Sequence, residues 1–428
     1  MENYIRIGAP SLEELQDVTR INCVIDENGK EYTLYAEVEK EYGQYLCTER
    51  ADAYLCLTLP IALRENYDIY CDVPVTERLL HNFQEILIPH LCMGDSRLHE
   101  ITIHAETDNT PLGGEGVGTG ISCGVDSLYT VKEYTNGKYS DMQLTHLFIA
   151  PANKELWNNL EEDTTLQKWV DSHQTQFERL DVVCEELDIP LVKLYNNYVY
   201  YLCKNGRGRK MYKHVYLHTF LTMSMVLTLK KLWNIYYFSS ASPFTTFTLQ
   251  DNATLQTGRY DLLTMHALTT PDFFIYSGGV KANRVRKTVE LLDFDLAKKV
   301  LHPCDTRDSQ NCSDPTCAKC LRALLTYDAY GRLDEVTELF DVERYEREKD
   351  KYFKRMIVHK DNPYIKDLYA MLSAKYPERV TRLETKINEK KAQKAAKEAA
   401  EGSADKAPEK KLPAKKSLLS RIKNKLRK

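Results

Sequence analysis

The chain has 428 residues, of which 43% are hydrophobic, and its formal net charge is only −4. This length predicts two ordinary domains with extensions, and the apolar content predicts a globular protein with a packed core. No apolar run reaches the roughly 18 uncharged residues of a membrane span, and the N-terminus lacks a signal-peptide pattern. Twelve cysteines without an export signal predict a cytoplasmic, reducing compartment, where clustered cysteines indicate a metal site more often than disulfides.

Residues 1–110 have the pattern of an N-terminal α+β domain. Short runs in which apolar and polar residues alternate predict strands at 20–25, 31–38, 53–58, 67–73 and 98–105. A helix is predicted over 75–88, because its apolar residues recur at helical spacing until Pro89. No pattern here predicts chemistry. The region is expected to shape a substrate pocket or a homodimer face, and the sequence favours neither.

Residues 111–345 are predicted to form the catalytic domain. Apolar runs predict strands at 117–121, 144–150, 190–195 and 235–239, and helical patterns at 166–187 and 212–232 lie among them. This alternation favours an α/β fold with a parallel sheet that is covered by helices on both faces. In such sheets ligands bind at the carboxyl ends of the strands, near the point where the strand order reverses.

The most informative stretch runs from Gly116 to Leu128. It predicts a short strand, a tight glycine turn and a helix in which Val125, Leu128 and Tyr129 share one face. Backbone N–H groups at such a turn, the helix dipole and the nearby serine hydroxyls favour an anion. Asp126 does not suit a pure phosphate cradle, but its carboxylate suits a Mg²⁺ ion that bridges phosphates.

The turn resembles the S-G-G-x-D-S loop of the PP-loop ATP pyrophosphatases. The matching residues are Ser122, Cys123, Gly124, Val125, Asp126 and Ser127. The resemblance implies a doubly wound, PP-loop (HUP-like) parallel sheet that splits ATP into AMP and pyrophosphate through an adenylated substrate. It also implies that these six residues bind the nucleotide, that Asp126 and Ser127 act in catalysis, and that backbone near Ile149 borders the adenine. The implied cofactors are ATP and Mg²⁺.

Cys123 departs from this resemblance, because the family usually has a glycine at its position. If that position needs a positive φ or a very close phosphate, a Cβ is costly there. The sulfonucleotide reductases, a related branch, resemble this chain in accepting a larger residue at the same place.

A second glycine turn follows at 277–280. It lacks the Asp-Ser pair of the first turn, so the pattern predicts a plain turn before a helix at 284–292. Lys281, Arg284 and Arg286 stand near the start of this helix, where they would face pyrophosphate, a substrate carboxylate or only solvent. The polar segment 259–261 is a further candidate for the substrate side.

Four of the twelve cysteines follow the spacing C-x7-C-x4-C-x2-C. They are Cys304, Cys312, Cys317 and Cys320. Thiolates at this density suit a tetrahedral Zn²⁺ ion, and a closed four-thiolate site is structural rather than catalytic. The cluster resembles that of the 7-cyano-7-deazaguanine synthases, a PP-loop branch that adenylates a deazapurine carboxylate and replaces AMP with ammonia nitrogen. About 115 residues precede the loop here, whereas that synthase begins almost at its loop, so the substrate stays open.

The C-terminal region is expected to be a helical extension over 346–390, followed by a disordered linker and a basic amphipathic helix over 391–428. Residues 386–428 hold 15 basic and 5 acidic side chains, so the charge of the chain is unevenly distributed. A terminal helix of this kind suits an anionic membrane surface, which would make the protein peripheral to the membrane, or nucleic acid. A solvated tail is the plain alternative.

Together these patterns predict an ATP-dependent adenylating enzyme. It would activate a carboxylate or similar oxygen of a small-molecule or macromolecular substrate for attack by ammonia or an amine. No glutaminase or hydrolase pattern is present, so the nitrogen is expected as free ammonia or from the acceptor. Two other hypotheses stay open. One is a tRNA- or nucleotide-modifying PP-loop enzyme, and the other is a non-catalytic nucleotide-binding component of a larger assembly.

Overall fold

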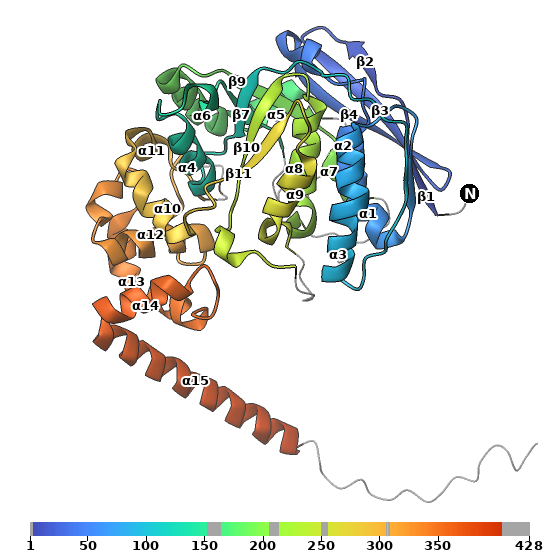
Figure 1. Ribbon diagram of the computed structural model, residues 1–428. Coiled ribbons are helices and arrows are strands. Elements are labelled where there is room, and N and C mark those ends of the chain that lie inside the picture. The colour runs from blue at the N-terminus through green and yellow to red at the C-terminus, as the bar shows by residue number, and fades with distance from the viewer. Residues whose placement is uncertain are drawn as a thin grey trace, which may run out of the picture.

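The computed structural model describes residues 3–151, 164–204, 214–249, 256–304, 306 and 309–404. Within these ranges, one sheet of eleven strands runs through the molecule (Figure 1). Its order is β11-β10-β7-β8-β9-β4-β3-β1-β5-β6, and β2 pairs with β3 beside this path. The first five strands in this order are parallel to one another, and the remaining strands come from the N-terminal region.

The parallel part of the sheet contains the strands that position the site. They are β7 (Gly116–Gly120), β8 (His146–Ile149), β9 (Leu191–Asn196), β10 (Trp233–Ser239) and β11 (Phe274–Gly278). Numbered in chain order, they lie as 5-4-1-2-3, so the order reverses between β7 and β10. Doubly wound folds bind their ligands outside the carboxyl ends of the strands at such a reversal.

Alternating side chains of the parallel strands enter two separate cores. In β8, Leu147 and Ile149 enter one core together with α4 (Val125–Tyr134). Phe148 lies between them in the sequence and enters the other core, together with α8 (His214–Thr228). Strand side chains point to opposite faces with a period of two, so helices cover both faces of the sheet. The predicted α/β class is confirmed.

The N-terminal region extends the same sheet. Its strands are β1 (Tyr4–Ile7), β2 (Ser11–Glu14), β3 (Val18–Glu27), β4 (Lys30–Glu39), β5 (Asp68–Cys71) and β6 (Ile103–His104). β4 pairs antiparallel with β9, with Glu37 opposite Tyr195. The sheet therefore runs unbroken past the boundary that the sequence predicts near residue 110.

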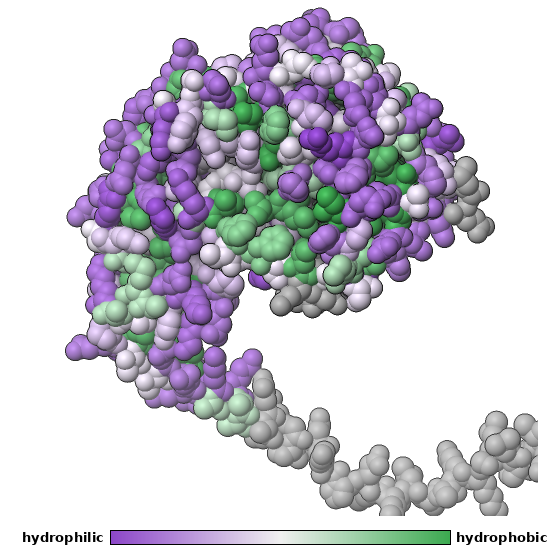
Figure 2. All heavy atoms as spheres, in the orientation of Figure 1, coloured by the Kyte–Doolittle hydropathy of each residue, from purple (hydrophilic) through white to green (hydrophobic). Residues whose placement is uncertain are grey.

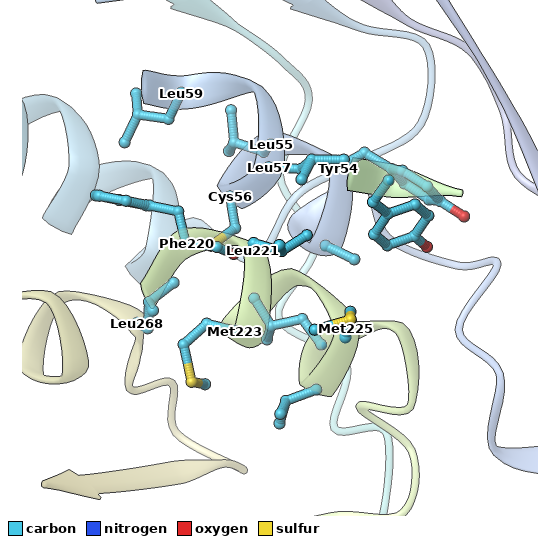
Figure 3. Close-up of a cluster of buried hydrophobic side chains, with 14 of the residues drawn as sticks. Tyr54, Leu55, Cys56, Leu57, Leu59, Phe220, Leu221, Met223, Met225 and Leu268 are labelled. Carbon is cyan, nitrogen blue, oxygen red and sulfur yellow. The ribbon is translucent and has the colours of Figure 1, made fainter. Parts of the chain in front are cut away.

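The segment 53–58 forms a helix, so the predicted strand is wrong. It lies in α1 (Asp52–Glu65), in which every residue from 52 to 59 is buried. A continuous apolar run has no period that separates a buried helix from a buried strand. α1 packs along α8, where the Cys56 thiol donates to the Phe220 carbonyl at 3.5 Å (Figure 3).

Three other elements differ from the predicted ones. The helix predicted over 75–88 is α2 (Glu77–His81) and α3 (Ile88–Gly94), which are joined by a π-helical turn. The strand predicted at 98–105 shortens to β6. The turn predicted at 277–280 begins inside β11, which the sequence pattern hides because glycine is uncommon in strands.

A buried ion pair joins the N-terminal region to the parallel part. Lys230 and Asp52 are each 2% exposed. The Lys230 ammonium lies 2.8 Å from the Asp52 carboxylate and donates to the Thr76 hydroxyl at 2.6 Å. A buried charge is tolerated only when it is paired and hydrogen bonded. This partner explains why a lysine directly after a long apolar run does not break the core.

The C-terminal region is helical. It contains α12 (Ala318–Tyr330), α13 (Val342–Val358), α14 (Lys366–Lys375) and α15 (Pro377–Ala404), and α15 forms the arm at the bottom of Figure 1. α15 continues past the end predicted at 390, and the rest of the predicted amphipathic helix lies outside the described residues. Among the helices that the structure describes, none has both the length and the apolarity that a bilayer crossing requires.

Candidate functional site

The glycine turn lies where the strand order reverses. After β7, Ile121 donates its N–H to the Phe148 carbonyl of β8 at 2.9 Å. α4 then begins at Val125, and Gly124 before it is extended. Ile149, the expected neighbour of adenine, ends the adjacent strand β8 and is 5% exposed. The predicted strand, turn and helix are present, so the first N–H groups of α4 lie at the edge where an anion is received in such folds.

Two serines close the turn. The Ser122 N–H donates to the Ser127 hydroxyl at 3.2 Å, and the two hydroxyl oxygens are also 3.2 Å apart. The Ser127 hydroxyl donates to the Gly124 carbonyl at 3.1 Å, while the Ser122 hydroxyl accepts from the Gly124 N–H at 3.4 Å. The structure therefore brings both predicted serines together. If an anion binds at the turn, its oxygen atoms would replace these internal acceptors as hydrogen-bond partners of the turn's N–H and hydroxyl groups.

Cys123 adopts a conformation that favours glycine. Its φ is +54°, and the left-handed region costs a residue with a Cβ about 1–2 kcal/mol. The side chain is 1% exposed and packs in the core, and the Cys123 carbonyl accepts from the His302 N–H at 2.8 Å. Burial raises the pKa of this thiol to about 12, so Cys123 is not a thiolate nucleophile near neutral pH.

Asp126 is the meeting point of two basic side chains from α10 (Arg284–Glu290). One carboxylate oxygen lies 2.5 Å from the Arg284 guanidinium, and the other lies 3.4 Å from the Lys287 ammonium. Lys287 is 1% exposed and also donates to the Ser240 carbonyl, just after β10, at 2.6 Å. Asp126 and Arg284 are 19% and 18% exposed, so a ligand could reach this pair from solvent.

Arg322 of α12 adds a third cation. Its guanidinium carbon lies 5.4 Å from the ring centre of Tyr364, and that of Arg284 lies 6.0 Å from the same ring. Burial lowers the pKa of Arg322, and the nearby charge of Arg284 lowers it further. Burial also lowers the pKa of Lys287, although Asp126 opposes that shift. The excess of positive charge around Asp126 favours an anionic ligand.

The cation cluster consists of Arg284, Lys287 and Arg322. The candidate anion site consists of the turn Ser122–Ser127 together with the cation cluster. Within the described residues, the buried Nε atom of Arg284 has no hydrogen-bond partner, so the site has a donor to spare.

Asp261 lies behind the cation cluster at the start of α9 (Asp261–Leu268). Its carboxylate accepts a hydrogen bond of 2.6 Å from the Ser240 hydroxyl, while the Ser240 carbonyl accepts from Lys287. Burial raises the pKa of Asp261 to about 6, against the lowering effects of the Ser240 hydrogen bond and the Lys287 charge. Of the segment 259–261, Asp261 is thus linked to Lys287 through Ser240.

Of the basic residues that the sequence predicts near the second turn, Arg284 alone joins the site. Lys281 pairs with a glutamate of α4 and is 62% exposed, and Arg286 pairs with a glutamate of its own helix. Two further cations of the site, Lys287 and Arg322, are not among the residues predicted from the sequence. Lys287 follows Arg284 at the i,i+3 spacing that places two side chains on one helix face, so a signal exists for it. Arg322 lies two residues after Cys320 in the same helix, but its position beside Arg284 follows only from the packing of α12 against α10.

The four predicted cysteines come together as the thiol cluster. It consists of Cys304, Cys312, Cys317 and Cys320, whose sulfur atoms all lie within 4.8 Å of one another. The Cys304–Cys317 and Cys312–Cys320 sulfur distances are 4.0 and 3.6 Å. A tetrahedral ion with metal–sulfur bonds of about 2.3 Å would separate its ligand sulfurs by about 3.8 Å. The thiol cluster therefore has the geometry to hold a metal ion such as zinc.

Contacts outside the thiol cluster shape the loop between its second and third cysteines. Ser313 has a φ of +45°, and the Tyr352 hydroxyl of α13 donates to its carbonyl. Asp314 accepts from the N–H and the hydroxyl of Thr316, both at 2.6 Å, which closes the turn that Asp-Pro indicates. Arg344 of α13 lies 2.8 Å from Asp314. α13 therefore supports the loop from outside.

Cys317 is held as the most acidic thiol of the thiol cluster. The neighbouring Cys320 thiol and backbone N–H groups at the start of α12 lower the pKa of Cys317. The hydrogen bond between the two thiols, together with burial, raises the pKa of Cys320. The thiolate is the form in which a cysteine binds a metal.

The thiol cluster and the glycine turn are connected through a short segment. His302, whose N–H holds the Cys123 carbonyl, lies two residues before Cys304. Cys317 caps the start of α12, and the same helix carries Arg322 to the cation cluster. The thiol cluster therefore positions two parts of the candidate anion site.

Comparison with known proteins gives no match. No protein-family model, no curated protein and no solved structure matches the chain. A functional assignment therefore depends on the residues of the site themselves.

Proposed function

We propose that the chain is an ATP-dependent adenylating enzyme that releases AMP and pyrophosphate. The observation that carries this proposal is the pairing of Asp126 with Arg284 and Lys287 beside the turn after β7, where the strand order reverses. A triphosphate brings several negative charges, and the start of α4 and the cation cluster would receive them. The resemblance of Ser122–Ser127 to the PP-loop motif supports the same function.

The internal ion pairs suit a site whose cations change partner when the ligand arrives. An unsatisfied buried donor such as the Arg284 Nε costs roughly 1–3 kcal/mol, and a phosphate oxygen would satisfy it. Movement of Arg284 toward the phosphate would release the Asp126 carboxylate. A freed carboxylate at this place would suit a Mg²⁺ ion bound to the same phosphates.

The proposed reaction joins a substrate oxygen to the α-phosphorus of ATP. A carboxylate oxygen attacks this phosphorus, the bond to the bridging oxygen breaks, and pyrophosphate leaves with the electron pair. The cation cluster stabilises the negative charge that develops on the leaving pyrophosphate. Ammonia or an amine then attacks the acyl carbon, the acyl–oxygen bond breaks, AMP leaves, and the nitrogen loses one proton.

The ion of the thiol cluster is proposed to be Zn²⁺ in a structural role. Four thiolate ligands leave no open position for water or substrate. The ion would affect the reaction only indirectly. By fixing the segment around the thiol cluster, it would help to position His302 beside the turn and Arg322 in the cation cluster.

The products of ATP turnover test the proposal. The full-length protein is incubated with Mg²⁺-ATP, ammonium and mixtures of carboxylic acids, and AMP is separated from ADP. We expect equal amounts of AMP and pyrophosphate, and the loss of both in Asp126→Ala. Asp141→Ala is the matched control, because Asp141 is exposed and lies in a short 3-10 turn outside the site. ADP in place of AMP would contradict the proposal.

A further inference from the structure

An apolar cavity of about 510 Å³ lies at the edge strand β11. Its walls come from α9, from β11 and from the segment that follows β10. The main lining side chains are Phe247, Leu263, Met265, Phe274, Tyr276 and Ser277. Figure 2 shows apolar residues gathered on the face of the molecule over this region. A cavity of this size suits one small ligand.

Three aromatic side chains around the cavity are partly exposed. Phe247 is 43% exposed, Phe274 is 40% exposed and Tyr276 is 44% exposed. Single exposed apolar side chains are common, but several of them around one cavity are typical of a ligand-binding site. The Tyr276 ring stacks on Tyr237 with 5.9 Å between ring centres, so its position is set before a ligand arrives.

The cavity and the cation cluster share two segments. Ser277 lines the cavity, and the turn after it brings Gly279 so close to Lys287 that a Cβ at Gly279 would lie 2.9 Å from the ammonium. The segment after β10 carries Phe247 into the cavity wall and also carries Ser240, whose carbonyl accepts from Lys287 at 2.6 Å. The lining of the apolar cavity and the contacts of Lys287 therefore lie on the same two segments.

Ser277 gives an independent indication of a ligand. Its hydroxyl oxygen is buried, and it has no hydrogen-bond partner in the part of the chain that the structure describes. The Arg284 Nε, on the side of the cation cluster, is in the same state. Because buried polar atoms are nearly always hydrogen bonded, these two atoms favour a ligand that places oxygen atoms between the cavity and the cation cluster.

We propose that this cavity binds the acyl substrate, and that the substrate is a carboxylic acid with an apolar, aromatic body. This assignment rests on the proposed function, because it names the substrate class of the same site. The rings of Phe247, Phe274 and Tyr276 pack against the apolar body. The positive charge of the cation cluster attracts the carboxylate, which then lies beside the turn that receives the triphosphate.

Binding of naphthalene-2-carboxylate to the full chain, without ATP, tests the cavity by itself. We expect saturable binding in calorimetry, and binding about tenfold weaker for naphthalene-2-carboxamide, which keeps the rings and lacks the charge. Phe247→Ser and Phe274→Ser should each weaken binding of the acid by about tenfold, and both side chains are exposed enough for the fold to survive. Tyr139→Ser is the matched control, because Tyr139 is 61% exposed and lies outside the cavity lining.

Equal binding of the acid and the amide, or binding that both phenylalanine variants leave unchanged, would overturn the assignment. AMP formation in the same preparations reports on the proposed function separately. If AMP forms while the acid binds independently of the cavity, the substrate class is wrong and the reaction stands. If binding depends on the cavity but ATP yields only ADP, the carboxylate cavity stands and the reaction is wrong.

Discussion

The thiol cluster and the candidate anion site are built in different ways. The thiol cluster takes all its ligands from one short segment, 304–320, so the spacing of the cysteines is enough to predict it. The candidate anion site takes its turn from Ser122–Ser127 and its cations from α10 and α12, which follow much later in the chain. A site whose residues all lie in one segment can be predicted from the sequence. For a site assembled by packing, the sequence predicts only the part that forms a local motif, which here is the turn.

The difference also separates what each region should control. The thiol cluster is closed, and it links the turn to α12, so its loss should mainly affect folding stability. The candidate anion site is partly open to solvent, and its one carboxylate is paired with two of its three cations, so changes there should mainly affect ligand binding. Four substitutions, in order of decreasing expected effect, test this separation.

Loss of the metal should have the largest effect. Cys320→Ser removes a ligand at a buried position, so the metal content should fall from one ion per chain, and the free energy of unfolding should fall by on the order of 5 kcal/mol. Elemental analysis and denaturant unfolding measure the two quantities. Cys92→Ser, outside the thiol cluster, should keep the metal. A protein that stays equally stable after chelation would contradict the structural role.

Loss of Arg284 should affect binding more than stability. Arg284→Ala removes the cation nearest to Asp126, so pyrophosphate affinity should fall by about 2–3 kcal/mol, or about 30- to 150-fold. Lys281→Ala is the matched control from the same segment, because Lys281 is 62% exposed and should leave pyrophosphate affinity nearly unchanged. Calorimetric titration measures both. Equal losses in the two variants would mean that only the general positive charge matters.

Asp261 should make stability depend on pH. Its folded-state pKa of about 6 lies above the ordinary value of about 3.9. Between these two pH values the folded state binds more protons than the unfolded state, so the free energy of unfolding falls as the pH rises from about 4 to about 6. Asp261→Asn removes the buried charge and keeps an acceptor for Ser240, so the free energy of unfolding above pH 6 should rise by about 1–3 kcal/mol. Urea unfolding should show this gain at neutral pH and little of it near about pH 4. A gain that is the same at both pH values would rule out the buried charge as its cause.

Cys123→Gly should have the smallest effect. Relief of the left-handed conformation, about 1–2 kcal/mol, should offset most of the lost packing of the buried thiol, so stability should change by less than about 1 kcal/mol. Cys184→Gly, within α6 (Gln174–Leu187), has no such relief and should cost about 2 kcal/mol. Thermal unfolding compares the pair, and similar losses for both would show that Cys123 is not strained.

The parallel sheet was predictable from the sequence where strands and helices differ in their hydrophobic period. The short apolar runs that form β8, β9 and β10 lie between polar segments, so the sequence predicts these strands. α1 is not visible as a helix, because it is buried on all sides and has no polar face. β11 is hidden by the glycines at its end. Both errors arise because tertiary packing, rather than local pattern, decides the structure of these segments.

The candidate site was predictable in the same uneven way. The turn and the four cysteines each lie in one segment, and their spacing carries the chemistry. Of the two cations that the sequence pattern does not reveal, Lys287 is buried and Arg322 is half-buried, whereas a lysine or arginine in a sequence is normally expected at the surface. Their role becomes visible only when α10 and α12 are packed beside α4.

Titration of Asp126→Asn with pyrophosphate, in the absence of Mg²⁺, tests whether Arg284 and Lys287 are the groups that bind pyrophosphate. In the unchanged protein, Asp126 is paired with Arg284 and Lys287, so it would compete with pyrophosphate for these two cations. Removal of its charge should therefore increase pyrophosphate affinity by about tenfold, while the same variant should produce no AMP from Mg²⁺-ATP. If pyrophosphate affinity falls or stays the same, the cations paired with Asp126 are not the groups that hold pyrophosphate, and the proposed site is wrong.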